Sequence, residues 1–584
     1  MNTSSSFLAG RSELMRALAA HRGALVRVGL VSLLVNLLML TPTLYMLQVY
    51  DRVVVSRNEL TLLAVSLIAL LLFVVIAVAE ALRSRLLVKA SAVIEASLGR
   101  RVFGAGFEAS LDPLSGDGAR ALGDLTTLRQ FLTGQAVFAF FDAPWTPIYI
   151  LVLFVLHPAL GAAALLFGIL QAVLAAWSHR QSVAPAQQAA EAAQRDQALV
   201  GGISRNAEAV EAMGMAPALH QRWAGLRRER RDAAGAQQEL GQRLGAVSKF
   251  TRQAQQSLIL GLGALLVIDG QLTAGAMIAA NVLTTRALAP IDTLVGSWRV
   301  AIAAREAFGR LERLLEAFPL REARPLPAAP AGFVTLQQVS AMVPGREAPV
   351  LDYIDLQLVP GTVTALIGPS GSGKSTLARV IMGVWPDVRG EVLLDGEPLA
   401  RLDRARLGPQ LGYLPQDIEL FEGSVADNIA RFGQPDPGRV IVAAQACGLH
   451  DAILRLPRGY DTPVGEAGHL LSAGMRQRIG LARAVYGQPS LVVLDEPNAN
   501  LDEAGELALA RLVRHLGEIG STVLVVSHRP GILSVAGRVV AMQAGRVRFD
   551  GPRDDVLAAL RSRPHASDPA PAPAPGFDPL MARP

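Results

Sequence analysis

The chain has 584 residues, enough for several domains, and 51% of them are hydrophobic. Its mean hydropathy of +0.33 is high for a soluble protein, while its formal net charge of +5 is small for this length. The pI is near 9.6, but no basic stripe carries interleaved aromatic residues, so we expect no nucleic-acid partner. A lone cysteine, Cys447, excludes an intramolecular disulfide, and no Cys/His set has the spacing of zinc ligands.

The first half of the sequence contains uncharged apolar stretches as long as a membrane-spanning helix. Residues 28–49 and 60–79 each supply the roughly 20 residues that such a helix needs. The first stretch is not typical of a signal peptide, because its polar lead-in is long and no small-residue cleavage site follows. Arginines gather before the first stretch and after the second, so the N-terminus and the segment after Ala79 are predicted to be cytoplasmic.

Two further apolar blocks predict two more helical hairpins. Residues 136–177 are interrupted by a His-Pro pair at 157–158. Residues 258–283 are broken by Asp-Gly-Gln at 269–271, and the second helix of this hairpin is expected to run on toward Pro290. The sequence therefore predicts six membrane spans.

Polar residues around these blocks indicate how the helices continue. Asp142, Pro144 and Pro147 make the start of the third span irregular, which favours a protein-lined position over a lipid-facing one. Residues 83–134 and 179–256 are rich in Ala, Gln, Arg and Glu, a composition that is typical of long polar helices. We expect these helices to extend into the cytoplasm.

From Phe333 onward the pattern changes to short β-rich runs separated by turn residues. The strand-like run TVTALIG is followed by GPSGSGKST and then by a helix-like run, which is the setting of the phosphate-binding loop GxxxxGK[ST]. In such a loop, glycine N–H groups and the helix N-terminus face phosphate oxygens, the lysine reaches the β- and γ-phosphates, and the serine hydroxyl binds Mg²⁺. The predicted ATP-binding residues are Gly368, Pro369, Ser370, Gly371, Ser372, Gly373, Lys374, Ser375 and Thr376, with Ser375 also a metal ligand.

Two further strand-like runs end in polar side chains. LVVLDEP predicts a buried strand that ends in Asp495, placed to hold the metal's water shell, and Glu496, placed to orient and deprotonate the attacking water. STVLVVSH ends in His528. Ligands of open α/β sheets bind outside the carboxyl ends of the strands, so the phosphate loop, Glu496 and His528 are predicted to converge. A solvated acid pair and a structural histidine are the alternatives.

The run LSAGMRQRIGLARA at 471–484 resembles the signature of ABC ATPases. Gln416 in GYLPQD and NLD at 500–502 stand in the order of an ABC nucleotide-binding domain, and LAPIDTLVGSWR is similar to an exporter membrane domain. The runs LMLTPTLYMLQVYDRVVVSRNELTLLAV and FDAPWTPIYILVLFVLHP resemble the type I secretion branch, more narrowly exporters of proteases, lipases and repeat-toxin-like proteins. The fold class that this resemblance implies is an α-helical six-span transmembrane domain followed by an α/β P-loop ABC ATPase domain.

The resemblance also implies residue roles. Gln416 would sense Mg²⁺ as a metal-site residue and couple to the membrane helices. Ser472 and Gly474 would contact the γ-phosphate bound by the partner subunit's loop, so that two chains enclose two ATP molecules. Asp502 would communicate across this dimer.

Glu496 would be the catalytic carboxylate and His528 would contact the γ-phosphate, so these two are the expected catalytic residues. The sequence also departs from the family pattern at two places. Ala473-Gly474-Met475 replaces the usual Gly-Gly-Gln, and no aromatic residue stands near Val343 to stack on adenine. Loss of such a stack would cost about 1–2 kcal/mol of ATP binding. Since neither change touches Lys374, Glu496 or His528, hydrolysis is still predicted.

The expected organisation is a cytoplasmic lead (1–25), a transmembrane domain (26–300), a linker (301–330), a nucleotide-binding domain (331–560) and a disordered Pro/Ala-rich tail (561–584). The lead is too short for a peptidase domain. The leading hypothesis is a homodimeric exporter of unfolded polypeptides in a bacterial inner membrane, with a periplasmic adaptor and an outer-membrane channel as the partners that the resemblance implies. The alternatives are an exporter of lipids or small molecules and a non-transporting membrane ATPase with a structural or signalling role.

Overall fold

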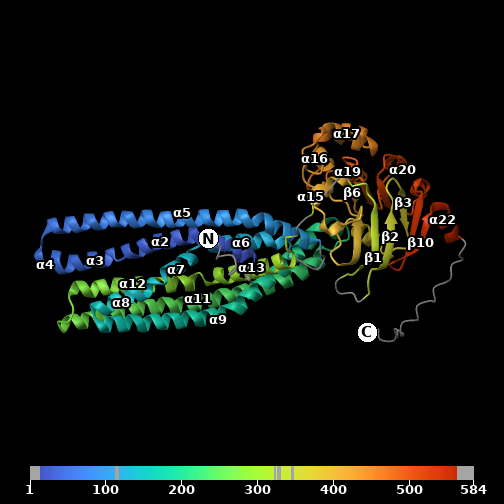
Figure 1. Ribbon diagram of the computed structural model, residues 1–584. Helices are drawn as coiled ribbons and strands as arrows, with labels where there is room; N and C mark the ends of the chain where they lie inside the picture. The colour runs from blue at the N-terminus through green and yellow to red at the C-terminus, as the bar shows by residue number, and fades with distance from the viewer. Residues whose placement is uncertain are drawn as a thin grey trace, which may run out of the picture. The chain divides into compact units, whose positions relative to one another are not determined.

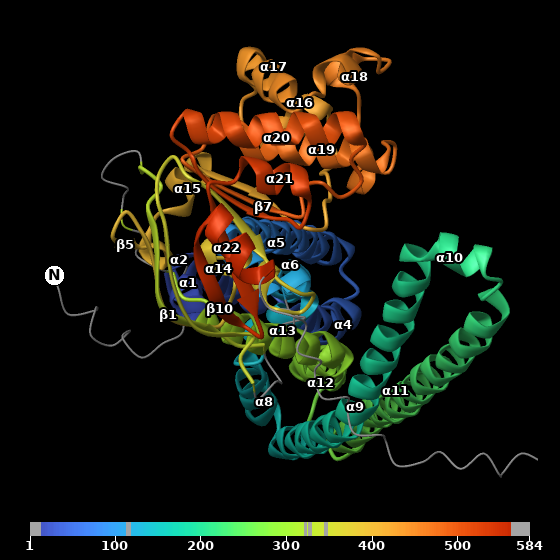
Figure 2. The same cartoon turned by 90° about the vertical axis from the view of Figure 1, so that its right-hand side faces the viewer.

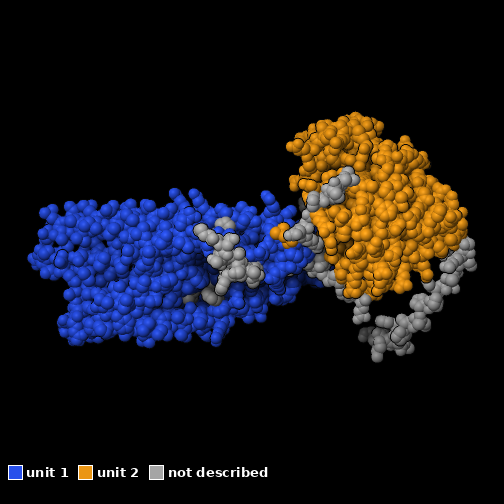
Figure 3. All heavy atoms as spheres, viewed as in Figure 1, with its two compact units in different colours: residues 1–110, 115–319 blue, residues 111–114, 320–584 orange. Residues whose placement is uncertain are grey.

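The computed structural model describes residues 13–20, 22–111, 118–320, 324, 330–343 and 348–561 (Figure 1). The chain forms two compact units, one of residues 1–110 and 115–319 and the other of residues 111–114 and 320–584 (Figure 3). The Pro/Ala-rich tail that we expected to be disordered lies outside the described residues.

The first unit is all helical. Its N-terminal part consists of α1 (Glu13–Ala20), α2 (Arg22–Leu38), α3 (Thr41–Gln48), a π-helical turn (Val49–Val53), α4 (Val54–Ser56) and the long α5 (Glu59–Ser110). After the short α6 (Ala121–Thr133) and the bent pair α7 (Gln135–Asp142) and α8 (Trp145–Leu156), it continues with α9 (Pro158–Arg205), α10 (Ala207–Ala212), α11 (Ala216–Ile268), α12 (Ala274–Gly296) and α13 (Trp298–Ala317).

Both predicted hairpin breaks are confirmed. The side chain of His157 accepts a hydrogen bond from the backbone N–H of Ala159 and so caps α9, and Pro158 occupies the first turn, where no N–H donor is needed. In the other hairpin, α11 ends at Ile268 and α12 begins at Ala274, with Gly270 in the left-handed region at φ 70°.

The predicted number of six spans is not confirmed. Among the described residues, four helical segments are long and apolar enough to cross a membrane: Arg22–Ser56, Glu59–Ser110, Pro158–Arg205 and Ala274–Leu294. The pair α7 and α8, bent by 47°, supplies a fifth if it forms one span. Helix α11 has charged residues spread over most of its length and is not among them, so the sixth span stays a prediction.

Helices α5, α9 and α11 continue far beyond their apolar parts, as their Ala-, Gln-, Arg- and Glu-rich sequences predicted. Helices α9 and α11 pack against each other and diverge toward α10 (Figure 2). Between them, the carboxylate of Asp196, only 3% exposed, accepts a hydrogen bond from Arg230 at 2.6 Å. This ion pair links the two polar helices where few apolar side chains are available to do so.

The second unit contains two sheets. An antiparallel sheet has the order β2-β1-β4-β5 and consists of β1 (Val334–Ala341), β2 (Leu351–Leu358), β4 (Val388–Leu394) and β5 (Glu397–Pro398). A six-stranded sheet has the order β10-β9-β3-β8-β7-β6 and consists of β3 (Val363–Ile367), β6 (Leu411–Leu414), β7 (Leu491–Asp495), β8 (Thr522–Val526), β9 (Arg538–Gln543) and β10 (Arg546–Pro552). Only β10 runs antiparallel to its neighbour in the larger sheet.

Helices flank these sheets and bury the central strands. They are α14 (Lys374–Ile381), α15 (Arg404–Leu407), α16 (Val425–Ile429), α17 (Pro437–Ala446), α18 (His450–Leu454), α19 (Ala473–Val485), α20 (Glu503–Glu518), α21 (Pro530–Val535) and α22 (Arg553–Arg561). Strands β3, β7 and β8 are buried along their whole length. The apolar run LVVLDEP predicted this for β7. Cys447 lies in the same core at 1% exposure, and burial raises the pKa of its thiol. This places it with the small apolar core residues.

Candidate active site

The phosphate-binding loop lies between the carboxyl end of β3 and the first turn of α14, as predicted. Gly368 and Gly373 both have positive φ, and a Cβ on Gly368 would come within 2.3 Å of the carbonyl oxygen of Met542. The Nζ atom of Lys374 donates hydrogen bonds to the carbonyls of Gly368 and Pro369, at 2.8 and 2.9 Å. Burial lowers the pKa of Lys374, while the charges of Glu496 and Asp495 oppose that shift. The loop is therefore a tight turn with a buried ammonium group folded across it.

The two predicted acids occupy the end of the neighbouring strand β7. Asp495 is 1% exposed, and neither of its carboxylate oxygens has a hydrogen-bond partner in the described part of the chain. Burial raises the pKa of Asp495, and the Ser375 hydroxyl and nearby cations only partly offset this. Glu496 has a left-handed φ of 49°, a strained conformation for a residue with a Cβ. Its backbone N–H donates to the carbonyl of Val526 at 3.0 Å, which ties the end of β7 to β8.

Gln416 and His528 complete this edge of the sheet. Gln416 follows β6, and its Nε2 atom donates to a carboxylate oxygen of Glu496 at 3.3 Å. His528 is exposed and lies two positions after the end of β8. Because β3, β8, β7 and β6 are adjacent and parallel, the segments that follow them meet at one edge. The predicted convergence of the phosphate loop, Glu496 and His528 at this edge agrees with the sheet order.

The segment that resembles the ABC signature forms the start of α19. Ser472 caps this helix by accepting a hydrogen bond from the N–H of Met475 at 3.3 Å. Gly474 lies against the loop that precedes α20, because a Cβ there would approach the carbonyl oxygen of Asn500 within 2.9 Å. Asp502 caps α20 by accepting from the N–H of Gly505 at 2.8 Å. Within the described residues, no hydrogen bond or ion pair joins the signature to the phosphate loop.

Comparison with known proteins agrees with this arrangement. The ABC transporter profile matches residues 351–499, and the profile of the ABC transporter transmembrane region matches residues 25–290. The chain belongs to the ABC transporters. It is 43% identical to the type I secretion system ATP-binding protein PrsD of Rhizobium meliloti, over 93% of this chain and 94% of that protein. It is 30% identical to the cyclolysin secretion/processing ATP-binding protein CyaB of Bordetella pertussis, over 93% and 77% of the two chains.

The fold of this ABC transporter is also found in a solved structure, that of a bacterial Atm1-family ABC exporter with ATP bound. The TM-score is 0.78 at 23% identity, and the likeness covers 94% of this chain and all of that one. Together with the family profiles, it shows an ABC exporter fold with a transmembrane region and an ATPase domain in the same chain. The identity to PrsD places the chain among type I secretion ATP-binding proteins.

The residues at the strand ends of this ABC transporter fit a bound Mg²⁺ ion. Two buried carboxylate oxygens of Asp495 lack protein donors, and hard oxygen ligands are what Mg²⁺ prefers. Ser375, in the first turn of α14, supplies a hydroxyl near this carboxylate. Gln416 can turn its amide oxygen to the same place. These three residues are the ones that the sequence predicted.

Sequence reasoning missed one residue that shapes the site. Arg431 has a positive φ of 57°, and its guanidinium donates to the carbonyls of Arg483 and Ala484 at the end of α19 and to those of Gly408 and Leu411 beside β6. Burial lowers the pKa of Arg431. An isolated Arg in a Phe-Gly turn carries no motif, so only the three-dimensional contacts reveal that it holds the signature helix against the sheet.

Met475, which stands where the ABC signature usually has glutamine, packs its side chain against the core. Its side chain is partly buried and packs against the large apolar core of the second unit. A glutamine at this position would place a polar amide against the same apolar core. Met475 therefore contributes apolar packing at the start of α19 in this ABC transporter.

Proposed function

We propose that this chain is the ABC component of a type I secretion system and uses ATP hydrolysis to export unfolded polypeptides across the bacterial inner membrane. One observation carries the proposal: a chain with apolar spans and an ATPase domain is 43% identical, over nearly its whole length, to the type I secretion ATP-binding protein PrsD. The similarity to CyaB, a cyclolysin secretion/processing protein, supports polypeptides over lipids or small molecules as cargo.

The geometry supports a role for each residue of the ATP site. The loop 368–376 would hold the phosphates through its N–H groups and Lys374. Asp495, Ser375 and Gln416 would hold Mg²⁺, which neutralises phosphate charge when bound. Glu496, held in place by its backbone bond to β8 and its contact with Gln416, would orient the attacking water and take its proton. His528 would contact the γ-phosphate from the end of β8.

We further propose that two copies of the chain form a homodimer. Within the described residues, no hydrogen bond or ion pair joins Ser472 or Gly474 to the chain's own phosphate loop, which supports a second copy that brings a signature to each ATP molecule. A symmetric pair with two equivalent sites is the simplest such assembly. Asp502, at the start of α20, would relay the state of one site to the other. A different half-transporter as partner is the alternative.

The proposed location is the inner membrane, with the N-terminus and the ATPase domain in the cytoplasm. Arginines before the first span and after the second support this orientation. A periplasmic adaptor and an outer-membrane channel would complete the path out of the cell. The similarity to type I secretion proteins supports both partners.

The proposal is tested by comparing the proteins secreted by cells that carry the native chain with those from cells that carry only Glu496→Gln. We expect one or a few proteins to disappear from the medium and to accumulate inside the mutant cells, and the purified mutant to retain ATP without turnover. Identical secreted proteins, together with ATP hydrolysis by the purified native chain, would instead support lipid or small-molecule export. A structural or signalling role would require that Glu496→Gln leave the cells unaffected.

A further inference from the structure

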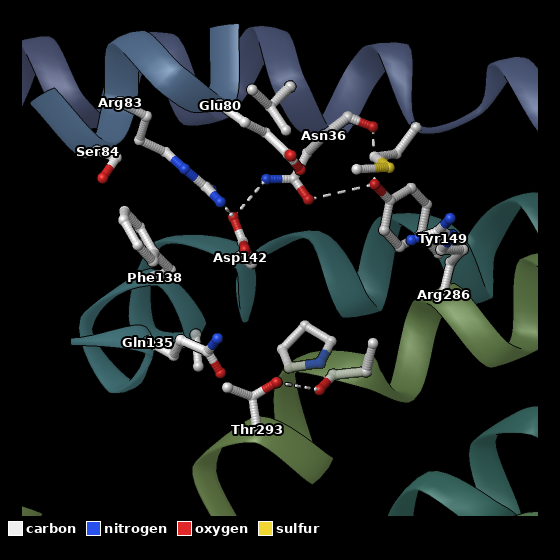
Figure 4. A pocket seen from close by; sticks show the side chains of 15 residues that line it. Asn36, Glu80, Arg83, Ser84, Gln135, Phe138, Asp142, Tyr149, Arg286 and Thr293 are labelled. Carbon is white, nitrogen blue, oxygen red and sulfur yellow. Dashed lines mark hydrogen bonds and ion pairs between the residues drawn. The ribbon is translucent and has the colours of Figure 1, made fainter. Parts of the chain in front are cut away.

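A cavity of about 350 Å³ lies inside the helical unit, among α2, α5, α7, α8 and α12 (Figure 4). It adjoins the break between α7 and α8, where the helix axis bends by 47°. Its volume is in the range of small-ligand sites, enough for a short stretch of extended chain but not for a folded domain. The lining mixes charged, amide, hydroxyl and aromatic side chains, which is unusual for the interior of apolar spans.

Part of the cavity wall is a polar network centred on Asp142. The Nη1 atom of Arg83 donates to the carboxylate of Asp142 at 2.9 Å, and the amide of Asn36 donates to the same oxygen at 2.7 Å. The hydroxyl of Tyr149 donates to the backbone carbonyl of Asn36 at 2.7 Å, and the Arg83 guanidinium lies 4.3 Å from the ring centre of Phe138. Asp142 therefore occupies the protein-lined position that the sequence predicted, and its charge is neutralised by Arg83.

Two further charges of the lining, Glu80 beside Asn36 and Arg286 beside Tyr149, are not satisfied in this way (Figure 4). Arg286 on α12 and Glu80 on α5 both line the cavity and are exposed, and within the described residues neither has a hydrogen bond or an ion pair. Glu80 directly follows the apolar stretch 60–79, so it stands where water can reach it. Arg286 lies inside the span Ala274–Leu294. A guanidinium within a span is costly unless an anion or water faces it, and such residues mark pathways for polar substrates.

We propose that this cavity binds a carboxylate of the extended polypeptide during its passage, with Arg286 as the residue that donates to it. This inference rests on the proposed function. A planar guanidinium presents paired donors that match a carboxylate, and the only other cation of the lining, Arg83, is already held by Asp142. A side-chain carboxylate and the carboxylate at the C-terminus of the cargo share this chemistry, and both could be the ligand.

The test uses the full chain, purified as its dimer and reconstituted in phosphatidylcholine vesicles, with three fluorescent synthetic peptides as probes. The first is rich in glutamate and has an amidated C-terminus. The second has glutamine at every glutamate position, and the third is the glutamine peptide with a free C-terminal carboxylate. Binding is followed by fluorescence anisotropy. The variants are Arg286→Gln, Arg286→Lys and the matched control Arg222→Gln, which removes the same charge from an exposed position of α11 outside the cavity.

We expect the native chain to bind at least one carboxylate peptide about tenfold more tightly than the all-amide peptide, as a charge-assisted hydrogen bond allows. Arg286→Gln should remove this preference, Arg286→Lys should keep part of it, and Arg222→Gln should keep all of it. Whether the first or the third peptide is preferred tells a side-chain carboxylate from the C-terminal one. Thermal unfolding of Arg286→Gln beside Arg286→Lys separates loss of the site from loss of the fold.

Two results would overturn the inference, and they differ from failure of the proposed function. Peptides that bind without a carboxylate preference, or with a preference that survives Arg286→Gln, would leave polypeptide export standing and remove this site. If none of the peptides binds, the polypeptide function and the site fail together. Competition by phosphatidylglycerol that depends on Arg286, with no effect of carboxylates, would assign the guanidinium to a lipid phosphate and overturn the inference.

Discussion

Replacing Arg431 by alanine would remove the side chain that links the signature helix to the large sheet. Its guanidinium donates to the carbonyls of Arg483, Gly408, Leu411 and Ala484, at 2.9, 2.9, 3.0 and 2.9 Å. The carbonyls of Arg483 and Ala484 belong to the last turn of α19, where helical partners are missing. Alanine would leave these acceptors without a protein donor.

The expected loss of unfolding free energy in Arg431→Ala follows from the number and the kind of these hydrogen bonds. A hydrogen bond to a charged group contributes about 1.5–3 kcal/mol, so four independent bonds would sum to roughly 6–12 kcal/mol. Two effects reduce this: Arg431 is only partly buried, so water can reach some of the carbonyls, and burying the guanidinium itself costs free energy, as its lowered pKa indicates. Single substitutions rarely cost more than about 4–5 kcal/mol. We therefore expect Arg431→Ala to lower the free energy of unfolding by about 3–4 kcal/mol.

The assay is thermal unfolding of the ATPase domain in the full-length chain, where a loss of this size lowers Tm by roughly 10 °C. Arg431→Lys keeps the charge but not the planar fork, and should lose about half as much. The matched control is Arg439→Ala, which breaks an exposed ion pair with Asp436 and should change the free energy by less than about 1 kcal/mol. If Arg431→Ala unfolds at the same temperature as Arg439→Ala, the four carbonyls are satisfied without Arg431 and the reasoning is wrong.

Three further predictions concern the two sites. Gly474→Val should lower the ATPase rate by about 100-fold with ATP binding retained, because its Cβ would displace the Asn500 carbonyl in the loop that precedes α20. Paired ATPase and nucleotide-binding measurements that find both unchanged would contradict this. Because burial raises the pKa of Asp495, a proton competes with Mg²⁺ for its carboxylate as the pH falls through that pKa, so the half-saturating Mg²⁺ concentration should rise on acidification. The same protonation stabilises the folded domain, so Asp495→Asn measured without Mg²⁺ should unfold no earlier than the native chain. Asp142→Ala should lower the free energy of unfolding by about 3 kcal/mol, because it leaves the buried charge of Arg83 without its partner. Adding Arg83→Met should restore most of the lost free energy. A double variant that unfolds earlier than Asp142→Ala would show that an uncompensated charge is not the cause.

The parts of the molecule that the sequence predicted well are those that short contiguous segments specify. The loop 368–376 needs a strand before it, a helix after it and glycines at fixed places, and all of these lie within one short stretch. Asp495 and Glu496 follow a strand that is apolar along its whole length, which marks it as central in a parallel sheet. The breaks at 157–158 and 269–271 combine helix-stopping residues with the ends of apolar runs.

The parts that the sequence did not predict depend on contacts between distant segments. Arg431 reaches carbonyls up to 53 positions away, and Arg83 pairs with Asp142 across 59 positions. Backbone carbonyls carry no sequence signal, so nothing in the sequence identifies them as partners of Arg431. The sixth predicted span is not confirmed for a related reason, since charged residues are spread over most of α11 and only its last residues form an apolar run. Hydropathy cannot separate a short span from the apolar end of a longer polar helix.

The two sites share one physical feature, a charged group that the protein buries or embeds without fully neutralising it. Asp495 keeps two carboxylate oxygens without donors at 1% exposure, and Arg286 keeps a guanidinium inside a span. Burial of Asp495 costs folding free energy, whereas the pair Arg83 and Asp142 shows that the chain can neutralise a buried charge where none is needed for binding. Lys374 and Arg379 offset the charge of Asp495 only in part, and Arg286 has no ion pair within the described residues. We infer that each is completed by a counter-charge from outside the chain: a cation for Asp495 and an anion for Arg286. Loss of that counter-charge should then destabilise the native chain more than the corresponding neutral variants.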